Sequence, residues 1–170
     1  MKPKVERGRR VVLWLGVTCL GLLPMALSCS RQKTPGAEEA FERGLSHAEK
    51  GDHDRAIADY TEAIRLDPKN AAAYYNRGVS YGKKGEYDKA IADCTEAIRL
   101  EPEFADAYYN RGNSYATKGD HDKAIADYTE AIRLDPKNAN FYAFRAKAYR
   151  ALGDEVKAAS DESKVQELKK

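Results

Sequence analysis

Small and apolar residues return along most of this chain at a constant interval of 34 residues. Three such series are Gly44, Gly78 and Gly112, then Ala56, Ala90, Ala124 and Ala158, then Pro68, Pro102 and Pro136. One stretch recurs letter for letter, since IADYTEAIRLDPKNA at Ile57–Ala71 is repeated at Ile125–Ala139. A fixed period of this length indicates tandem copies of one supersecondary unit.

Each copy contains the pattern of two amphipathic helices. In the second copy, one helical face is formed by Tyr74, Arg77, Gly78 and Tyr81. The next is formed by Ala90, Ile91, Cys94, Ala97 and Ile98. Gly85 separates the two stretches and Pro102 follows the second, as expected at helix ends. Small residues on the facing sides let the helices approach closely, so each copy is predicted to fold as a helical hairpin.

The pattern over residues 37–170 resembles the tetratricopeptide repeat (TPR). In the third copy the matching residues are Tyr108, Gly112, Tyr115, Ala124, Tyr128, Ala131 and Pro136. The resemblance implies an all-α fold, a right-handed α-solenoid of four TPR helix hairpins at 37–70, 71–104, 105–138 and 139–170. The outer units depart most from the pattern, because each has a face towards water. The polar last helix is predicted to act as a cap.

An arginine precedes the repeated glycine or alanine, at a place where this family usually has leucine. The four arginines are Arg43, Arg77, Arg111 and Arg145, and an aspartate follows each after 16 residues, at Asp59, Asp93, Asp127 and Asp161. A charge on a packing face needs a partner. We therefore predict a ladder of Arg–Asp pairs, within each unit or between neighbouring units. The alternative is a row of arginines that binds an anion.

The TPR resemblance also implies that the first helices line a concave, peptide-binding groove. The candidate groove residues are Tyr75, Asn76, Tyr109, Asn110, Asn113 and Asn140. An amide side chain donates and accepts hydrogen bonds, which suits the backbone of an extended peptide. The alternative is a solvated polar helix face. Tyr75 and Val79 stand where the family's chaperone-tail clamp needs lysine and asparagine, so recognition of a C-terminal carboxylate by that clamp is not expected.

The N-terminal segment has the layout of an export signal. A basic start precedes an uncharged stretch at residues 11–28, and Ser28 and Cys29 follow an apolar run. This ending resembles a bacterial lipoprotein signal, which implies a signal peptide at 1–28, lipidation of Cys29 and a tether at 29–36. The mature protein would then be exported and membrane-anchored, at the periplasmic face or cell surface of a bacterium. The alternatives are an uncleaved membrane anchor or a plain signal peptide.

Charge and composition exclude several other functions. The formal net charge of +2 includes a basic leader, and the repeats themselves are slightly acidic, so no nucleic-acid partner is expected. No phosphate loop or nucleophile motif is present, which predicts a non-enzymatic protein with no cofactor and no small-molecule substrate. His53 and His121 lack further ligands at metal-site spacing. The predicted function is a scaffold for a protein or peptide partner; the alternative is a structural subunit that self-assembles through its ends or convex face.

Overall fold

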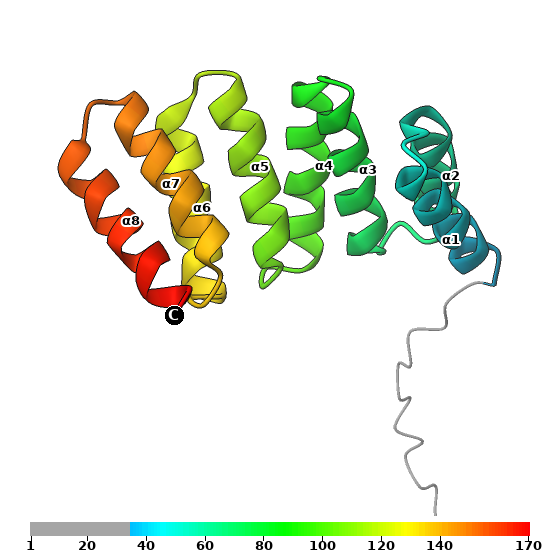
Figure 1. Cartoon of the computed structure of the whole chain (residues 1–170). Coiled ribbons are helices and arrows are strands. Elements are labelled where there is room, and N and C mark those ends of the chain that lie inside the picture. The colour runs from blue at the N-terminus through cyan, green and yellow to red at the C-terminus, as the bar shows by residue number, and fades with distance from the viewer. Residues whose placement is uncertain (1–34) are drawn as a thin grey trace, which may run out of the picture. The chain divides into compact units, whose positions relative to one another are not determined.

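The computed structural model describes residues 35–170, which form eight α-helices (Figure 1). In chain order they are α1 (Pro35–Glu49), α2 (His53–Leu66), α3 (Ala71–Lys83), α4 (Tyr87–Leu100), α5 (Ala105–Thr117), α6 (His121–Leu134), α7 (Ala139–Ala151) and α8 (Glu155–Leu168). The predicted signal peptide, Cys29 and most of the predicted tether lie outside the described residues. Pro35 and Gly36, which the sequence assigned to the tether, form the first residues of α1. No helix within residues 35–170 has the length and apolar character needed to cross a membrane.

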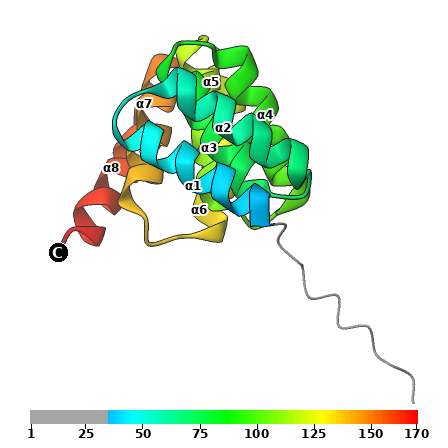
Figure 2. The same ribbon diagram turned by 90° about the vertical axis from the view of Figure 1, so that its right-hand side faces the viewer.

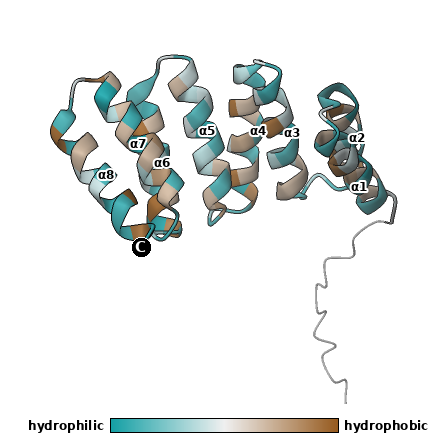
Figure 3. Cartoon of the chain, viewed as in Figure 1, coloured by the Kyte–Doolittle hydropathy of each residue, from teal (hydrophilic) through white to brown (hydrophobic). Residues whose placement is uncertain are grey.

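The helices pack as four consecutive hairpins, α1/α2, α3/α4, α5/α6 and α7/α8. The second helix of each hairpin also packs against the first helix of the next, and Figure 2 views this series from the end occupied by α1 and α2. Hydrophilic and hydrophobic residues alternate along each helix, as expected when one stripe is buried (Figure 3). The predicted all-α fold of tandem helix hairpins is confirmed.

Local sequence determines where the helices start and stop. A glycine follows the first helix of every hairpin and adopts a positive φ, for example +79° at Gly85, a conformation that other residues rarely adopt. Side chains of Asp52, Asn70 and Asp154 accept hydrogen bonds from backbone N–H groups in the first turns of α2, α3 and α8. The glycine therefore accounts for the turn that recurs in every hairpin, whereas side-chain caps of this kind are absent from α4, α5 and α6.

The repeated glycines let an aromatic ring lie directly against the facing helix. A Cβ atom added at Gly44 would lie 2.6 Å from the Tyr60 ring, and one at Gly112 would lie 2.8 Å from the Tyr128 ring. The last hairpin has Ala146 at this place and the exposed residue Glu162 opposite it, so no ring needs the space. In the first and third hairpins glycine and aromatic ring therefore fill one volume, whereas Gly78 of the second hairpin faces Cys94.

The outer face of α8 is polar where the other second helices are apolar. At the places of Tyr128 and Ile132 in α6, α8 carries Glu162 and Gln166, and both are exposed. Glu162 forms an ion pair with Arg150 of α7, with an N–O distance of 2.8 Å. This face is suited to contact with water rather than with a further repeat.

Candidate functional site

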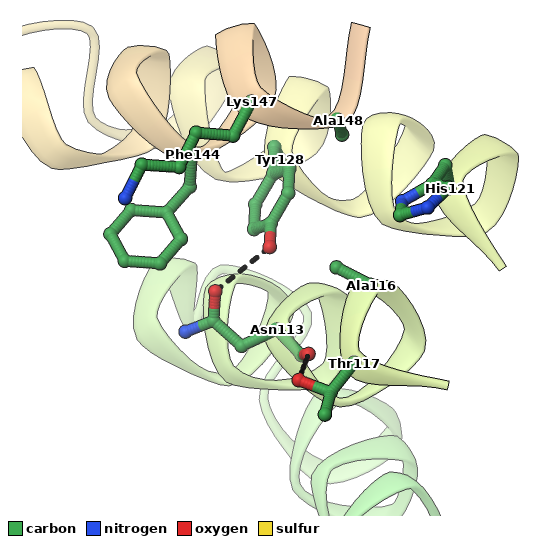
Figure 4. A pocket seen from close by; sticks show the side chains of 8 residues that line it. All are labelled: Asn113, Ala116, Thr117, His121, Tyr128, Phe144, Lys147 and Ala148. Carbon is green, nitrogen blue, oxygen red and sulfur yellow. Dashed lines mark hydrogen bonds between the residues drawn. The ribbon is translucent and has the colours of Figure 1, made fainter. Parts of the chain in front are cut away.

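The first helices of the hairpins form a continuous surface. Each of α1, α3 and α5 contacts the next odd-numbered helix, whereas within residues 35–170 no two even-numbered helices are in contact. Two hollows lie along this surface. The α3–α5 hollow, of about 250 Å³, is lined by residues of α3 and α5 together with Tyr87. The α5–α7 hollow, of about 260 Å³, is lined by α5, α6 and α7 (Figure 4). We call the two hollows together the odd-helix groove.

Two predicted asparagines, Asn110 and Asn113, line this groove. Asn110 lines the α3–α5 hollow, and Asn113 lines both hollows. The Asn110 amide nitrogen donates to the Asp106 carbonyl at 2.9 Å and to the Tyr75 hydroxyl at 3.1 Å, which leaves its side-chain oxygen as an acceptor. The Asn113 oxygen accepts from the Tyr128 hydroxyl at 2.8 Å, which leaves its nitrogen as a donor (Figure 4). One hollow thus presents an acceptor and a donor side by side.

The other two predicted asparagines are not among the residues that line the two hollows. The Asn76 amide nitrogen donates to the carbonyl of Ala72 at 2.8 Å, within its own helix. Asn140 is exposed in the first turn of α7, where its backbone N–H donates to the Asn138 side chain at 3.1 Å. Of the four asparagines, the structure therefore brings together Asn110 and Asn113.

The two predicted tyrosines pack between neighbouring hairpins. The Tyr75 ring lies 4.7 Å from that of Phe104, and burial, followed by the nearby Asp106, raises the pKa of Tyr75 to about 12. The Tyr109 ring lies 5.2 Å from the rings of both Phe141 and Phe144. These contacts join successive hairpins, and a role for the two tyrosines in ligand contact stays a prediction.

Comparisons with known proteins agree with this geometry. The family described as "Tetratricopeptide repeat" matches residues 71–104 and 105–138, and the one described as "TPR repeat" matches residues 44–85. A crystal structure of MamA is 31% identical, with a TM-score of 0.76 and 78% of each chain covered. The chain belongs to the tetratricopeptide-repeat family. No curated protein matches it.

Two further solved TPR domains resemble this TPR chain. One is the first TPR domain of Spaghetti (RPAP3), bound to the HSP90 peptide SRMEEVD, at 28% identity and a TM-score of 0.68. It covers 69% of this chain and 94% of its own. The other is the TPR domain of Arabidopsis OM64, at 27% identity and a TM-score of 0.67, covering 68% of this chain and 95% of its own.

The predicted Arg–Asp ladder of this TPR protein is confirmed. In each of the last three hairpins the guanidinium forms two bonds of 2.8–2.9 Å to the aspartate of the same hairpin. It also donates to a threonine of the preceding hairpin, as Arg77 does to Thr61 at 3.0 Å. Hydrogen bonding to Asp93 raises the pKa of Arg77. Because these guanidinium groups are already paired, the alternative of an anion-binding row is not supported.

Sequence reasoning missed two lysines of the groove. Lys83 lines the α3–α5 hollow and Lys147 lines the α5–α7 hollow. The spacing contained a signal for the second, since Lys147 stands 34 residues after Asn113 and so occupies the same place in its repeat. The Lys147 ammonium lies 4.5 Å from the centre of the Phe144 ring, which holds it beside the hollow.

The described residues show no arrangement typical of a metal site or a reactive thiol. Within residues 35–170, no group of three or more His, Cys, Asp or Glu side chains is placed to hold a metal ion. Cys94 is buried where the neighbouring hairpins have tyrosine, and burial raises the pKa of its thiol to about 12. A thiol of this kind is protonated at neutral pH, so Cys94 acts as a packing residue.

Proposed function

We propose that this TPR protein is a non-enzymatic scaffold that holds an extended segment of a protein partner in the odd-helix groove. The pair Asn110 and Asn113 carries the proposal. One side chain offers an acceptor and the other a donor in the same hollow, and a peptide group needs both. The RPAP3 domain, which has a related fold, is bound to a peptide, and this supports peptide binding as a function of the fold.

Capture of partners by the full chain tests this proposal. The matched variants are Asn110→Ala with Asn113→Ala, and Asn140→Ala as a control on the same series of helices but outside the two hollows. Partners captured by the wild type and the control should be lost by the double variant. Circular dichroism and thermal melting would verify that both variants are folded. Equal capture by all three proteins would contradict binding in the groove.

The proposal includes attachment to a membrane through the N-terminal segment. The support is the sequence alone: a basic start, an uncharged stretch at 11–28 and Cys29 after Ser28. We expect a mature chain that begins at a lipid-modified Cys29, as measured by mass spectrometry of the protein isolated from membranes. Cys29→Ser should leave the leader in place. An intact Met1 in the wild-type protein would favour the uncleaved anchor.

Self-assembly through the ends of the solenoid is less well supported. Glu162 and Gln166 make the outer face of α8 polar, and at the other end Glu39 stands where α3 and α5 have the buried residues Ala73 and Ala107. Polar groups at both ends oppose head-to-tail stacking. Light scattering of the purified protein should therefore report a monomer, and a concentration-dependent oligomer would revive the structural-subunit alternative.

A further inference from the structure

Both hollows of the odd-helix groove are lined by a positive charge with no negative charge beside it in the lining. Each has one lysine among its lining residues, Lys83 in one and Lys147 in the other, and neither has a lining carboxylate. Among the described residues 35–170, neither lysine forms an ion pair. The chain as a whole has 27 acidic residues against 29 basic ones, so acids are not scarce. Their absence from these hollows is a local feature of the groove.

Six other lysines of residues 35–170 form ion pairs, namely Lys84, Lys89, Lys118, Lys123, Lys157 and Lys164. Lys84 and Lys118, at the ends of α3 and α5, bind Asp54 and Asp88 of the preceding hairpins. Others pair within one helix or its cap, as Lys123 does with Asp120 at 2.6 Å. Within this part of the chain Lys83 and Lys147 form no such pair, as is also true of the exposed Lys50 and Lys137, but Lys83 and Lys147 each line a hollow that has no carboxylate in its lining. An unpaired cation in a hollow is available to an anionic ligand.

A third donor lies between the two lysines. Asn113 lines both hollows, and its oxygen is held by the Tyr128 hydroxyl, so that its amide nitrogen is the group left to donate. Carboxylate oxygens accept from ammonium and amide groups alike. Lys83, Asn113 and Lys147 therefore form one donor track along the groove, whereas the Asn110 oxygen supplies an acceptor for a backbone N–H.

The first hairpin has the opposite charge. Glu42 occupies the place of Asn110 in its repeat, and Glu49 occupies the place of Lys83. Both glutamates are exposed on α1. An acidic ligand would be attracted by the last three hairpins and repelled by the first, which confines it to α3, α5 and α7.

Resting on the proposed scaffold function, we propose that the odd-helix groove selects an internal acidic segment of a protein partner through Lys83, Asn113 and Lys147. Acidic side chains of the segment bind the two lysines, and its backbone binds Asn110 and Asn113. A free chain end is not required, because the recognised groups are side-chain carboxylates and peptide groups. The acceptor on Asn110 favours a peptide, which offers N–H groups, over a polyphosphate.

Fluorescence anisotropy with three labelled peptides tests the selection. The peptides share a Ser/Leu background and an amidated C-terminus, and carry Glu, Gln or Lys at the same places. The full chain should bind the Glu peptide about tenfold more tightly than the Gln peptide, and the Lys peptide least. The preference should weaken as salt is added, because the cations are at the surface.

Two pairs of variants connect the preference to these residues. Lys83→Gln with Lys147→Gln should reduce binding of the Glu peptide to that of the Gln peptide. Lys50→Gln with Lys137→Gln removes two exposed lysines that do not line the hollows and should leave the preference unchanged. Glu42→Gln with Glu49→Gln should leave the Glu peptide bound as tightly or more tightly. Circular dichroism would verify folding in each case.

The outcomes separate this inference from the scaffold proposal. Equal binding of the Glu and Gln peptides, or a preference that survives loss of both lysines, would overturn acidic selection. Displacement of the Glu peptide by a single-stranded oligonucleotide at similar concentration would overturn it in favour of general polyanion binding. In each case, partner capture that depends on Asn110 and Asn113 would leave the scaffold proposal standing. Loss of that dependence would remove the scaffold proposal itself.

Discussion

The second helices of the first and third hairpins, α2 and α6, have nearly the same sequence but different contacts. They read HDRAIADYTEAIRL and HDKAIADYTEAIRL, with one difference at Arg55 and Lys123. Yet the Tyr128 hydroxyl donates to Asn113, whereas the Tyr60 hydroxyl is buried with no hydrogen-bond partner among residues 35–170. The cause lies on the facing helix, because α1 carries Leu45 where α5 carries Asn113.

The arginine that faces each of these helices shows a second difference. Arg111 makes two bonds to Asp127, donates to Thr95 of the preceding hairpin and lies 5.6 Å from the Tyr108 ring. Arg43 makes one bond, of 3.1 Å, to Asp59. Within residues 35–170 Arg43 has no hydrogen bond to a threonine, and Ala40 stands where Tyr108 stands in the third hairpin. The same residue pair is therefore tighter where a neighbouring hairpin completes its surroundings.

Replacing Arg111 and Arg43 should give the largest difference in stability between the third and the first hairpin. Arg111→Leu leaves the buried Asp127 carboxylate without its cation and should lower the free energy of unfolding by about 3 kcal/mol. Arg43→Leu should cost less than about 1 kcal/mol, because the Arg43 side chain is 48% exposed. Urea denaturation followed by circular dichroism measures both losses. Equal losses would show that the preceding hairpin does not strengthen the pair.

Glycine substitutions test what α2 and α6 have in common. Gly44→Ala and Gly112→Ala each force a methyl group against a tyrosine ring and should each cost about 2 kcal/mol of unfolding free energy. Gly78→Ala should cost less, because its nearest contacts are at 3.2 Å and Cys94 replaces the ring. Thermal unfolding would rank the three variants. A loss at Gly78 as large as the other two would show that the backbone, not the ring, sets the limit.

These comparisons indicate which features the sequence could predict. The hairpins and the Arg–Asp pairs follow from spacings within one repeat, where 16 residues bring the two helices face to face. Contacts between hairpins depend on how one repeat is rotated against the next, which no spacing within a repeat specifies. The packing of Tyr75 on Phe104 and the bond from Arg77 to Thr61 belong to this class.

The residues of the candidate groove also fall into those that the sequence could predict and those that it could not. The sequence picked out Asn110 and Asn113 through amide chemistry and the TPR resemblance, and both line the hollows. It did not pick out Lys83 and Lys147, because lysine on a helix is usually a solvated or ion-paired residue. Their distinction is that they line two hollows whose linings contain no carboxylate, which becomes visible only when residues of several helices are placed together.

Removing the hydroxyl groups of Tyr60 and Tyr128 tests whether the different contacts of α2 and α6 change the stability of the protein. Tyr128→Phe deletes a hydrogen bond to Asn113 and should cost about 1 kcal/mol of unfolding free energy. Tyr60→Phe deletes a buried hydroxyl that has no partner among the described residues, so stability should stay the same or rise. Chemical denaturation of both variants gives the difference. A loss from Tyr60→Phe equal to that from Tyr128→Phe would indicate that Tyr60 has a bond of its own.

The smallest expected change in stability concerns the aspartate in the first turn of α2 and of α6. Asp54 of α2 pairs with Lys84 of the next hairpin, whereas the equivalent place for Asp122 of α6 is Leu152, which is 49% exposed. Leu152→Lys should supply the missing partner and raise the free energy of unfolding by less than about 1 kcal/mol, since the pair is exposed. The gain should disappear at high salt, where such charges are screened. Adding Asp122→Asn provides the control, because the new lysine should then give no salt-dependent gain. A gain that survives both treatments would come from removing an exposed apolar side chain rather than from a new ion pair.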